Sequence, residues 1–173
     1  MKCYAVVDTN VIVSALITKN PDSPPRQVFR AMLTGDIVPL YHPDILAEYE
    51  EVLCREKFHL QVETVRTVVD AIRQFGIEVQ PKPTGEILID MDDLVFYEVA
   101  MEKRDDGAYL VTGNQKHYPV RHFIVTPRRN GGDSEEVIPF RPKGGQKISL
   151  PKGAKAEKVP CKALTKRRKS DIL

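Results

Sequence analysis

Short apolar, β-branched runs alternate with segments of helical periodicity along most of this chain. The apolar runs are at 3–7, 37–41, 108–112 and 123–126. The helical segments are at 11–17, 26–33, 43–53, 62–75 and 92–102. Continuous apolar runs of this length are typical of strands that are covered on both faces. The alternation therefore predicts an α/β fold, in which a mostly parallel sheet carries helices on both faces.

The composition changes after Pro127, where the alternation stops. Residues 1–127 contain 13 Lys and Arg against 19 Asp and Glu, a net charge of −6, whereas residues 128–173 contain 13 against 5, a net charge of +8. The second segment is also rich in Gly and Pro. We expect one folded domain at 1–127 and a basic, disordered tail at 128–173. Such a tail could contact the phosphates of a nucleic acid, or it could be a solvated end without a partner.

Several classes of protein are excluded by simple patterns. No run of about 18 apolar residues is present, so we expect no membrane-spanning helix. Asp8 interrupts the first apolar run too early for a secretory signal peptide. Cys3, Cys54 and Cys161 lie far apart and form no zinc-ligand pattern with the four histidines. We expect a cytoplasmic protein with reduced thiols.

Three acidic residues and one amide fall where parallel strands and their crossover helices should meet. Asp8 ends the first apolar run, and Asn114 follows the third. Glu48 lies in the second turn of the helix at 43–53, and Asp93 lies at the start of the last helix. The carboxyl ends of parallel strands share one edge of the sheet, and right-handed crossovers bring helix starts to that edge. We therefore expect these four side chains to converge.

Converging carboxylates repel one another, so this arrangement calls for a hard cation such as Mg²⁺ or Mn²⁺. A divalent ion at this position suits hydrolysis of a phosphodiester, because it stabilises charge on a phosphate oxygen. Each acid alone also has an ordinary interpretation. Asp8 and the cluster at 90–93 could be helix caps, and Glu48 could belong to a solvated helix face.

In this order, the residues resemble the PIN-domain ribonucleases, specifically the VapC-like toxins of toxin–antitoxin pairs. The resemblance covers residues 1–127. The matching stretches are at 6–16, 45–53, 90–93, 109–114 with Lys116 and His117, and 123–127. It implies a three-layer α/β/α sandwich, a Mg²⁺ or Mn²⁺ site, endonucleolytic cleavage of RNA, and a cognate antitoxin as protein partner.

By the same resemblance, Asp8, Glu48 and Asp93 would hold the metal. Four further residues would shape or complete the pocket, namely Asn10, Ser14, Thr112 and Asn114. Asn114 stands where many relatives have a fourth acid, and an amide brings no charge. Asp90 or Asp92 could supply the missing charge, and the sequence does not choose between them.

Three alternatives stay open at this point. A catalytically weakened PIN module could bind RNA or a protein without cutting. A phosphatase that uses Asp8 as nucleophile would require a second Asp at position 10, where Asn10 stands, and a receiver domain would require its phosphorylated Asp on a later strand.

His117 could assist phosphate binding or proton transfer, or be a surface residue. The apolar helix faces at 26–33 and 62–75 could form a homodimer interface or simply pack in the core.

Overall fold

The computed structural model describes residues 3–127. The expected tail at 128–173 lies outside the described residues. Within them, five parallel strands form one sheet in the order β3-β2-β1-β4-β5. The strands are β1 (Cys3–Val7), β2 (Ile37–Tyr41), β3 (Ile77–Glu78), β4 (Tyr109–Val111) and β5 (Ile124–Val125). The four expected strands are confirmed. The sequence pattern missed β3, because its two exposed residues form no apolar run.

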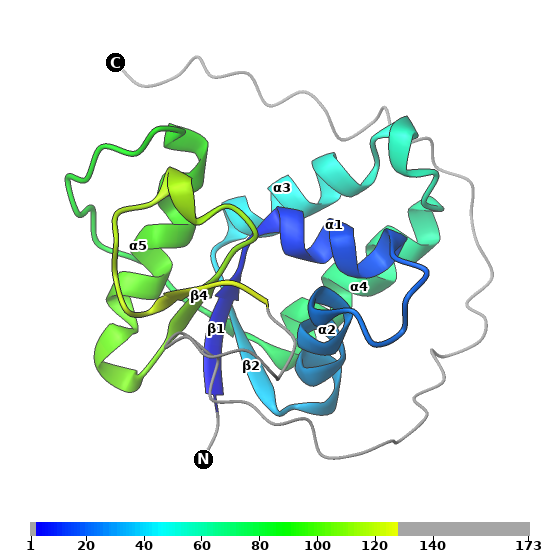
Figure 1. Ribbon diagram of the computed structural model, residues 1–173, viewed down its shortest axis with the longest axis horizontal. Coiled ribbons are helices and arrows are strands. Elements are labelled where there is room, and N and C mark those ends of the chain that lie inside the picture. Colours follow the sequence, from blue (N-terminus) through cyan, green and yellow to red (C-terminus); the bar gives the residue numbers. More distant parts are fainter. Residues whose placement is uncertain (1–2, 128–173) are drawn as a thin grey trace.

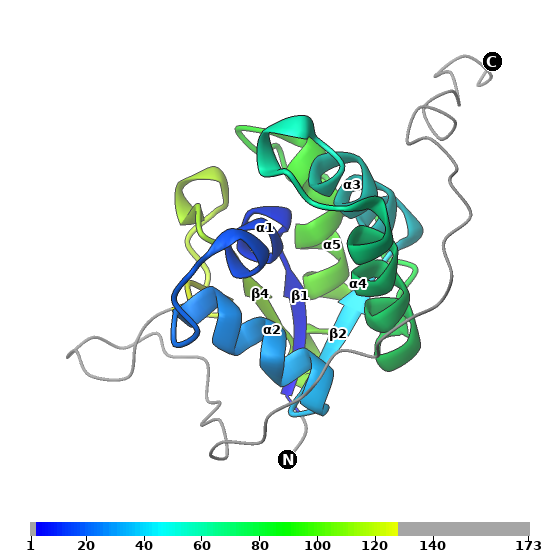
Figure 2. The ribbon, with the colours of Figure 1, turned by 90° about the vertical axis from the view of Figure 1, so that its right-hand side faces the viewer.

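Five α-helices of the segment 3–127 pack around this sheet (Figures 1 and 2). They are α1 (Thr9–Ile17), α2 (Pro24–Thr34), α3 (Pro43–Leu53), α4 (Val62–Phe75) and α5 (Leu94–Glu102). The residues between and after these helices form short 3₁₀ turns, namely η1 (Glu56–Phe58), η2 (Met91–Asp93), η3 (Arg104–Asp106) and η4 (Gln115–His117). No helix of residues 3–127 has both the length and the apolar character needed to cross a membrane.

The centre of the sheet is covered on both faces. Ala5, Val6 and Val7 are consecutive residues of β1 and are each at most 1% exposed. Because successive side chains of a strand point to opposite faces, both faces of β1 must be covered. Helix α5 packs against β1, β2 and β4, and α2 and α4 pack against β2. The predicted three-layer α/β/α arrangement is therefore confirmed.

The apolar faces of α2 and α4 lie in the core of the single chain. Val28 and Met32 on α2, and Val65, Val68 and Ile72 on α4, are all buried, and the two helices contact each other. Packing within one chain therefore accounts for both faces. Formation of a homodimer stays a prediction.

Two helices near the carboxyl ends of the strands begin at different residues from those expected. Helix α1 begins at Thr9, directly after β1, because the Asp8 side chain caps it. Helix α5 begins at Leu94, because 91–93 form the 3₁₀ turn η2 instead of its first turn. As a result, Asp8 and Asp93 both precede a helix.

Candidate active site

Asp8 is a buried carboxylate whose two oxygens are both held by hydrogen-bond donors. Oδ1 accepts from the Asn10 backbone N–H at 3.0 Å, which confirms the interpretation as a helix cap. Oδ2 accepts from the Thr112 hydroxyl at 2.6 Å and from the Tyr118 hydroxyl at 3.4 Å. Asp8 is only 5% exposed to solvent. Its hydrogen-bond donors in the described residues are thus all neutral, so they orient the carboxylate without balancing its charge.

Glu48 reaches the same region from α3. That helix starts beside the sheet because His42 caps it, accepting from the Asp44 N–H at Nδ1, and because Pro43 suits its first turn. The Thr9 hydroxyl donates to Glu48 Oε1 at 2.5 Å, so Glu48 is tied to the neighbour of Asp8. It is half-buried and held in place, and is therefore more than a member of a solvated helix face.

The charge of Glu48 is costly where it lies. Burial is the main cause that raises the pKa of Glu48, and the nearby charges of Asp8, Asp93 and Asp92 raise it further. The hydrogen bond from Thr9 lowers this pKa in part. The fold therefore holds Glu48 near other carboxylates at some electrostatic cost.

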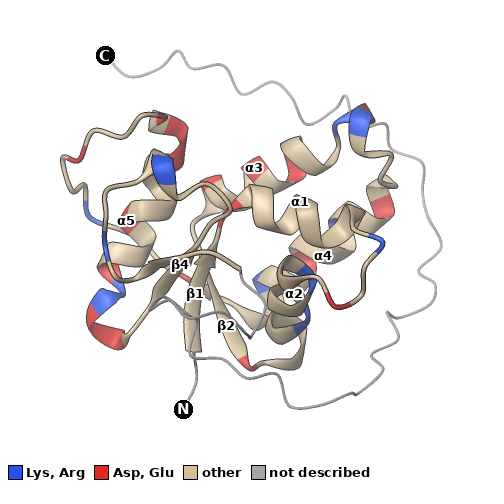
Figure 3. Cartoon of the chain, viewed as in Figure 1, with Lys and Arg blue, Asp and Glu red and all other residues tan. Residues whose placement is uncertain are grey.

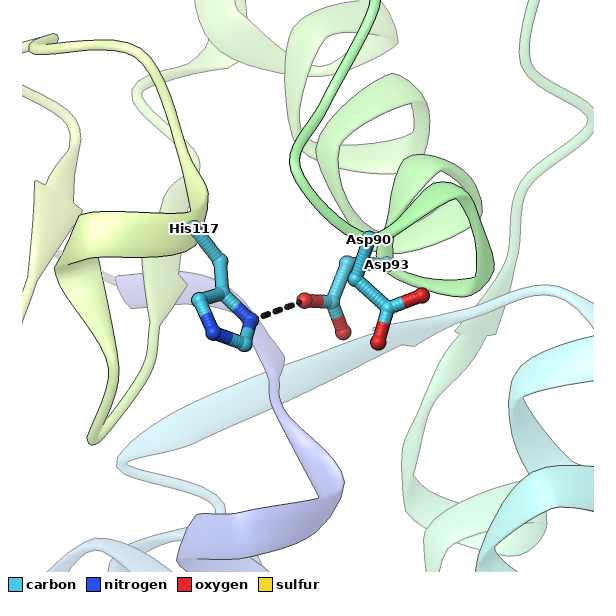
Figure 4. A group of neighbouring side chains, drawn as sticks. All are labelled: Asp90, Asp93 and His117. Atoms are coloured by element: carbon cyan, nitrogen blue, oxygen red, sulfur yellow. Dashed lines mark hydrogen bonds and ion pairs between the residues drawn. The ribbon is translucent and has the colours of Figure 1, made fainter.

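Asp93 is the last residue of η2 and faces His117 on η4. Nδ1 of His117 lies 3.0 Å from Oδ2 of Asp93 (Figure 4). Burial is the main cause that raises the pKa of Asp93, the charges of Asp8 and Asp90 raise it further, and the hydrogen bond with His117 lowers it. Asp90, Asp93 and His117 each offer a ligand atom within 4.8 Å of the others. In this geometry Asp90, which also caps η2 by accepting from the Asp92 N–H, is the acid that joins Asp93.

Asn114 lies at the end of β4, where its chain position predicts it. Its backbone N–H donates to the Thr112 hydroxyl at 2.9 Å, and its side-chain Nδ2 lies 2.7 Å from Nε2 of His117. The preceding Gly113 N–H donates to Asn10 Oδ1 at 2.9 Å. A Cβ at position 113 would lie only 2.8 Å from that oxygen, so glycine permits this close approach.

A groove of about 940 Å³ opens beside Glu48 and Asp93. Its lining includes seven acidic residues, namely Asp44, Glu48, Glu51, Asp90, Asp92, Asp93 and Glu98. Among the described residues that line it, Arg55 is the one Lys or Arg, and it pairs with Glu51 at 3.2 Å. Figure 3 shows acidic residues on α3 and on the segment before α5. This groove would repel a polyanion unless a cation were bound there.

The donor set fits a divalent cation such as Mg²⁺ or Mn²⁺. Asp8, Glu48 and Asp93 offer carboxylate oxygens, which these ions prefer. Their hydrogen-bond donors are hydroxyls, a backbone amide and an imidazole, and the pKa values of Glu48 and Asp93 are raised partly by neighbouring carboxylates. A cation among these groups would remove the repulsion that raises them.

Two residues of this region were missed by sequence reasoning. Thr9 contacts Glu48, and Tyr118 contacts Asp8. The position of Thr9, next to Asp8, was the available signal, whereas nothing in the sequence marked Tyr118. Burial is the main cause that raises the pKa of Tyr118, and the charge of Asp8 adds to it, so Tyr118 stays a neutral donor. Ser14, expected to shape the pocket, is half-buried on α1.

Comparison with known proteins finds similarity to a protein family, to a curated protein and to a solved structure. A family model described as PIN domain matches residues 4–116. An uncharacterized protein of Methanocaldococcus jannaschii is 27% identical over 118 residues, which are 66% of this chain and 73% of that protein. The fold is also similar to a chain in the crystal structure of VapBC2 from Rickettsia felis bound to a DNA fragment from their promoter. That match has a TM-score of 0.42 and 21% identity, and covers 65% of this chain and 89% of the other.

Proposed function

The chain belongs to the PIN-domain family, and from that premise we propose that it is a divalent-cation-dependent ribonuclease that cleaves RNA internally. PIN domains are generally nucleases, so the general class of activity follows from the family. The dependence on Mg²⁺ or Mn²⁺ and the preference for RNA are our proposals. The described region, residues 3–127, contains the whole matched segment, residues 4–116.

What supports this proposal is that hydrogen bonds and electrostatic interactions link three carboxylates from distant parts of the chain. Asp8, Glu48 and Asp93 interact closely enough that the charges of Asp8 and Asp93 raise the pKa of Glu48. Each lies within hydrogen-bond distance of a polar side chain, namely Thr112 for Asp8, Thr9 for Glu48 and His117 for Asp93. Carboxylates are kept together at such a cost where a cation offsets the repulsion.

In this proposal, Asp8, Glu48 and Asp93 hold the cation. When bound, a divalent ion supplies positive charge that stabilises developing negative charge on a phosphate oxygen. The chain itself supplies orientation: Thr112 and Tyr118 fix Asp8, Thr9 fixes Glu48, and the groove beside them leaves room for a nucleic-acid strand. Asp90 adds further negative charge near Asp93.

A second function is favoured by Asn114. An amide at this position leaves one charge fewer than a carboxylate would, which weakens cation binding. The chain would then be a PIN module that binds RNA or a protein without cutting it. Binding of RNA that is equally strong with and without a chelator would support this second function.

Our narrower proposal is that the protein is the toxin of a toxin–antitoxin pair and acts in the cytoplasm. The sequence resemblance to VapC-like proteins supports it, and the partner would be a cognate antitoxin. Induced expression should arrest growth, and Asp8→Asn should relieve the arrest at equal protein level. Normal growth during induction of the folded parent protein would contradict the toxin role but leave the nuclease activity to be measured directly.

The direct test is RNA cleavage by the full-length protein with Mg²⁺ or Mn²⁺. We expect Asp8→Asn to lower the cleavage rate by at least about 100-fold, because it removes a charge at the ion and disturbs its orientation. Asp22→Asn, an exposed Asp on the loop before α2, should leave the rate unchanged. Cleavage that persists both in excess chelator and in Asp8→Asn would refute the proposal.

A further inference from the structure

A continuous chain of hydrogen bonds links Asp8 to Asp93 through the segment after β4. Oγ1 of Thr112 donates to Asp8 Oδ2 and accepts from the Asn114 backbone N–H. The side chain of Asn114 then contacts Nε2 of His117, and Nδ1 of His117 contacts Asp93. Two of the three carboxylates of the candidate site are thus joined by one short segment.

For a neutral imidazole, the placement of Asn114 Nδ2 beside His117 sets the direction of each bond. Nδ2 of Asn114 carries only hydrogens to donate, so Nε2 of His117 must accept at 2.7 Å. A neutral imidazole carries its one proton on the other nitrogen, so Nδ1 donates to Asp93 Oδ2 at 3.0 Å. The amide of Asn114 thereby selects the tautomer of His117 that can hold the Asp93 carboxylate.

Both nitrogens of His117 are therefore engaged in this arrangement. Although the imidazole lies within 4.8 Å of ligand atoms of Asp90 and Asp93, neither nitrogen has a lone pair left for a cation. The imidazole is also only partly exposed, at 34% of its side chain. Its geometry suits orientation of Asp93 better than direct ligation.

We propose that His117 is a positioning residue for Asp93, and that Asn114 is a positioning residue for His117. This inference rests on the proposed function, in which Asp93 holds the cation. It gives a different role to Asn114 from that of a missing fourth acid. A carboxylate at 114 would offer Nε2 only acceptors, and would pull a proton onto that nitrogen. An amide at 114 keeps Nε2 unprotonated and leaves the proton of His117 facing Asp93.

The first arm of the test reads the tautomer in the metal-free, full-length protein. Imidazole nitrogens are observed by ¹H–¹⁵N NMR at a pH about two units above the usual histidine pKa of about 6.5. Comparison with His117→Asn assigns the signals of His117 among the four histidines. We expect a protonated Nδ1 and an unprotonated Nε2, and we expect Nε2 to gain a proton in Asn114→Asp. A protonated Nε2 in the parent protein would overturn the proposal.

The second arm measures Mn²⁺ affinity by calorimetry. Loss of a residue that orients a metal ligand typically costs 10–100-fold in affinity, so we expect His117→Ala to weaken binding by about 10-fold or more. His117→Asn should restore most of this loss, because its amide N–H can take the place of Nδ1–H. His122→Ala, which removes an exposed imidazole outside the site, should bind Mn²⁺ like the parent. Thermal melting of each variant confirms that it is folded.

The results separate positioning from ligation. Parent-like Mn²⁺ affinity in folded His117→Ala would overturn the proposal. A nitrogen coupling in the electron spin echo spectrum of the Mn²⁺ complex, lost in His117→Asn, would show that His117 is a ligand and would overturn it as well. A parent protein that binds no Mn²⁺ would contradict the proposed function, whereas the NMR signals of the metal-free protein decide the hydrogen-bond chain by themselves.

Discussion

Asp8 and Glu48 carry the same charge, but the molecule holds them in different ways. Asp8 is almost fully buried, and three donors from α1 and from the segment after β4 occupy both of its oxygens. Glu48 is half-buried at the rim of an acidic groove, and Thr9 holds one of its oxygens. We call Asp8 and its hydrogen-bond donors the Asp8 side, and Glu48 and the neighbouring acidic residues of the groove the groove side. The folding of the whole sheet fixes the Asp8 side, because its donors come from distant parts of the chain. The groove side holds several negative charges close together at an electrostatic cost. Removal of a polar group from the Asp8 side should lower the stability of the folded protein, whereas removal of a charge from the groove side should raise it.

The largest effect should come from Thr112→Val, which removes a hydroxyl on the Asp8 side. Thr112 is fully buried, and its loss leaves Asp8 Oδ2 and the Asn114 N–H without their short hydrogen bonds. A buried group that loses its partner costs about 1–3 kcal/mol, so we expect urea unfolding to show about 2 kcal/mol less stability. Thr67→Val, on the exposed face of α4, should change stability by less than about 0.5 kcal/mol. Equal effects of the two variants on stability would show that the buried hydrogen bonds of Thr112 do not fix the Asp8 side.

Glu48→Gln should act in the opposite direction and stabilise the metal-free protein. The amide keeps an acceptor for Thr9 but removes a charge that burial and neighbouring carboxylates disfavour. Because Glu48 is only half-buried and therefore screened, we expect a gain on the order of 1 kcal/mol in thermal unfolding. Glu50→Gln on the same helix is the matched control and should have little effect. If Glu48→Gln lowered the stability of the metal-free protein, the negative charge of Glu48 would not be unfavourable in the fold.

The pH dependence sharpens the same comparison. The pKa of Glu48 is raised above its ordinary value of 4.5, so the folded protein binds this proton more tightly than the unfolded chain does. Its contribution to stability is therefore fully present below about pH 4.5 and is lost as the pH rises through the raised value. The stability advantage of Glu48→Gln should accordingly shrink as the pH falls toward 4.5. An advantage that grew on acidification would contradict the direction of this shift.

A smaller effect than those of Thr112→Val and Glu48→Gln should come from Glu98→Ala, which loosens the segment 79–90 at the groove. Glu98 accepts from the Thr84 backbone N–H at 2.7 Å on the exposed surface, so its loss should cost about 0.5 kcal/mol. Hydrogen exchange should become faster in that segment and stay unchanged in β1 and β4. Glu102→Ala, which removes a longer bond of 3.3 Å to the Lys82 N–H, should have a still smaller effect.

The positions of the candidate site residues could be predicted from chain order alone. Asp8 and Asn114 follow strands of a parallel sheet, and the edge where such strands end is determined by topology. Glu48 and Asp93 follow from the same rule applied to the crossover helices. These predictions depend on which element a residue lies in, and they do not require its rotamer.

The partners of these residues could not be predicted in the same way. The contacts of Thr9 with Glu48 and of Tyr118 with Asp8 depend on side-chain rotamers set by tertiary packing. Strand β3 is similar, because two exposed residues pair with β2 only after the chain has turned at Gly76, where a Cβ would lie 2.7 Å from the carbonyl of Pro39. Sequence periodicity reports local structure and does not predict such long-range contacts.

The bond between Asp8 and Thr112 joins residues 104 positions apart in the chain. During synthesis, Asp8 leaves the ribosome long before β4, which pairs with β1 at the centre of the sheet. A nascent chain that stops before Thr112 therefore has no partner for Asp8 Oδ2 and no Asn114, His117 or Tyr118. The site can therefore be assembled only after the chain has been synthesised through Tyr118, so any shorter nascent chain lacks it.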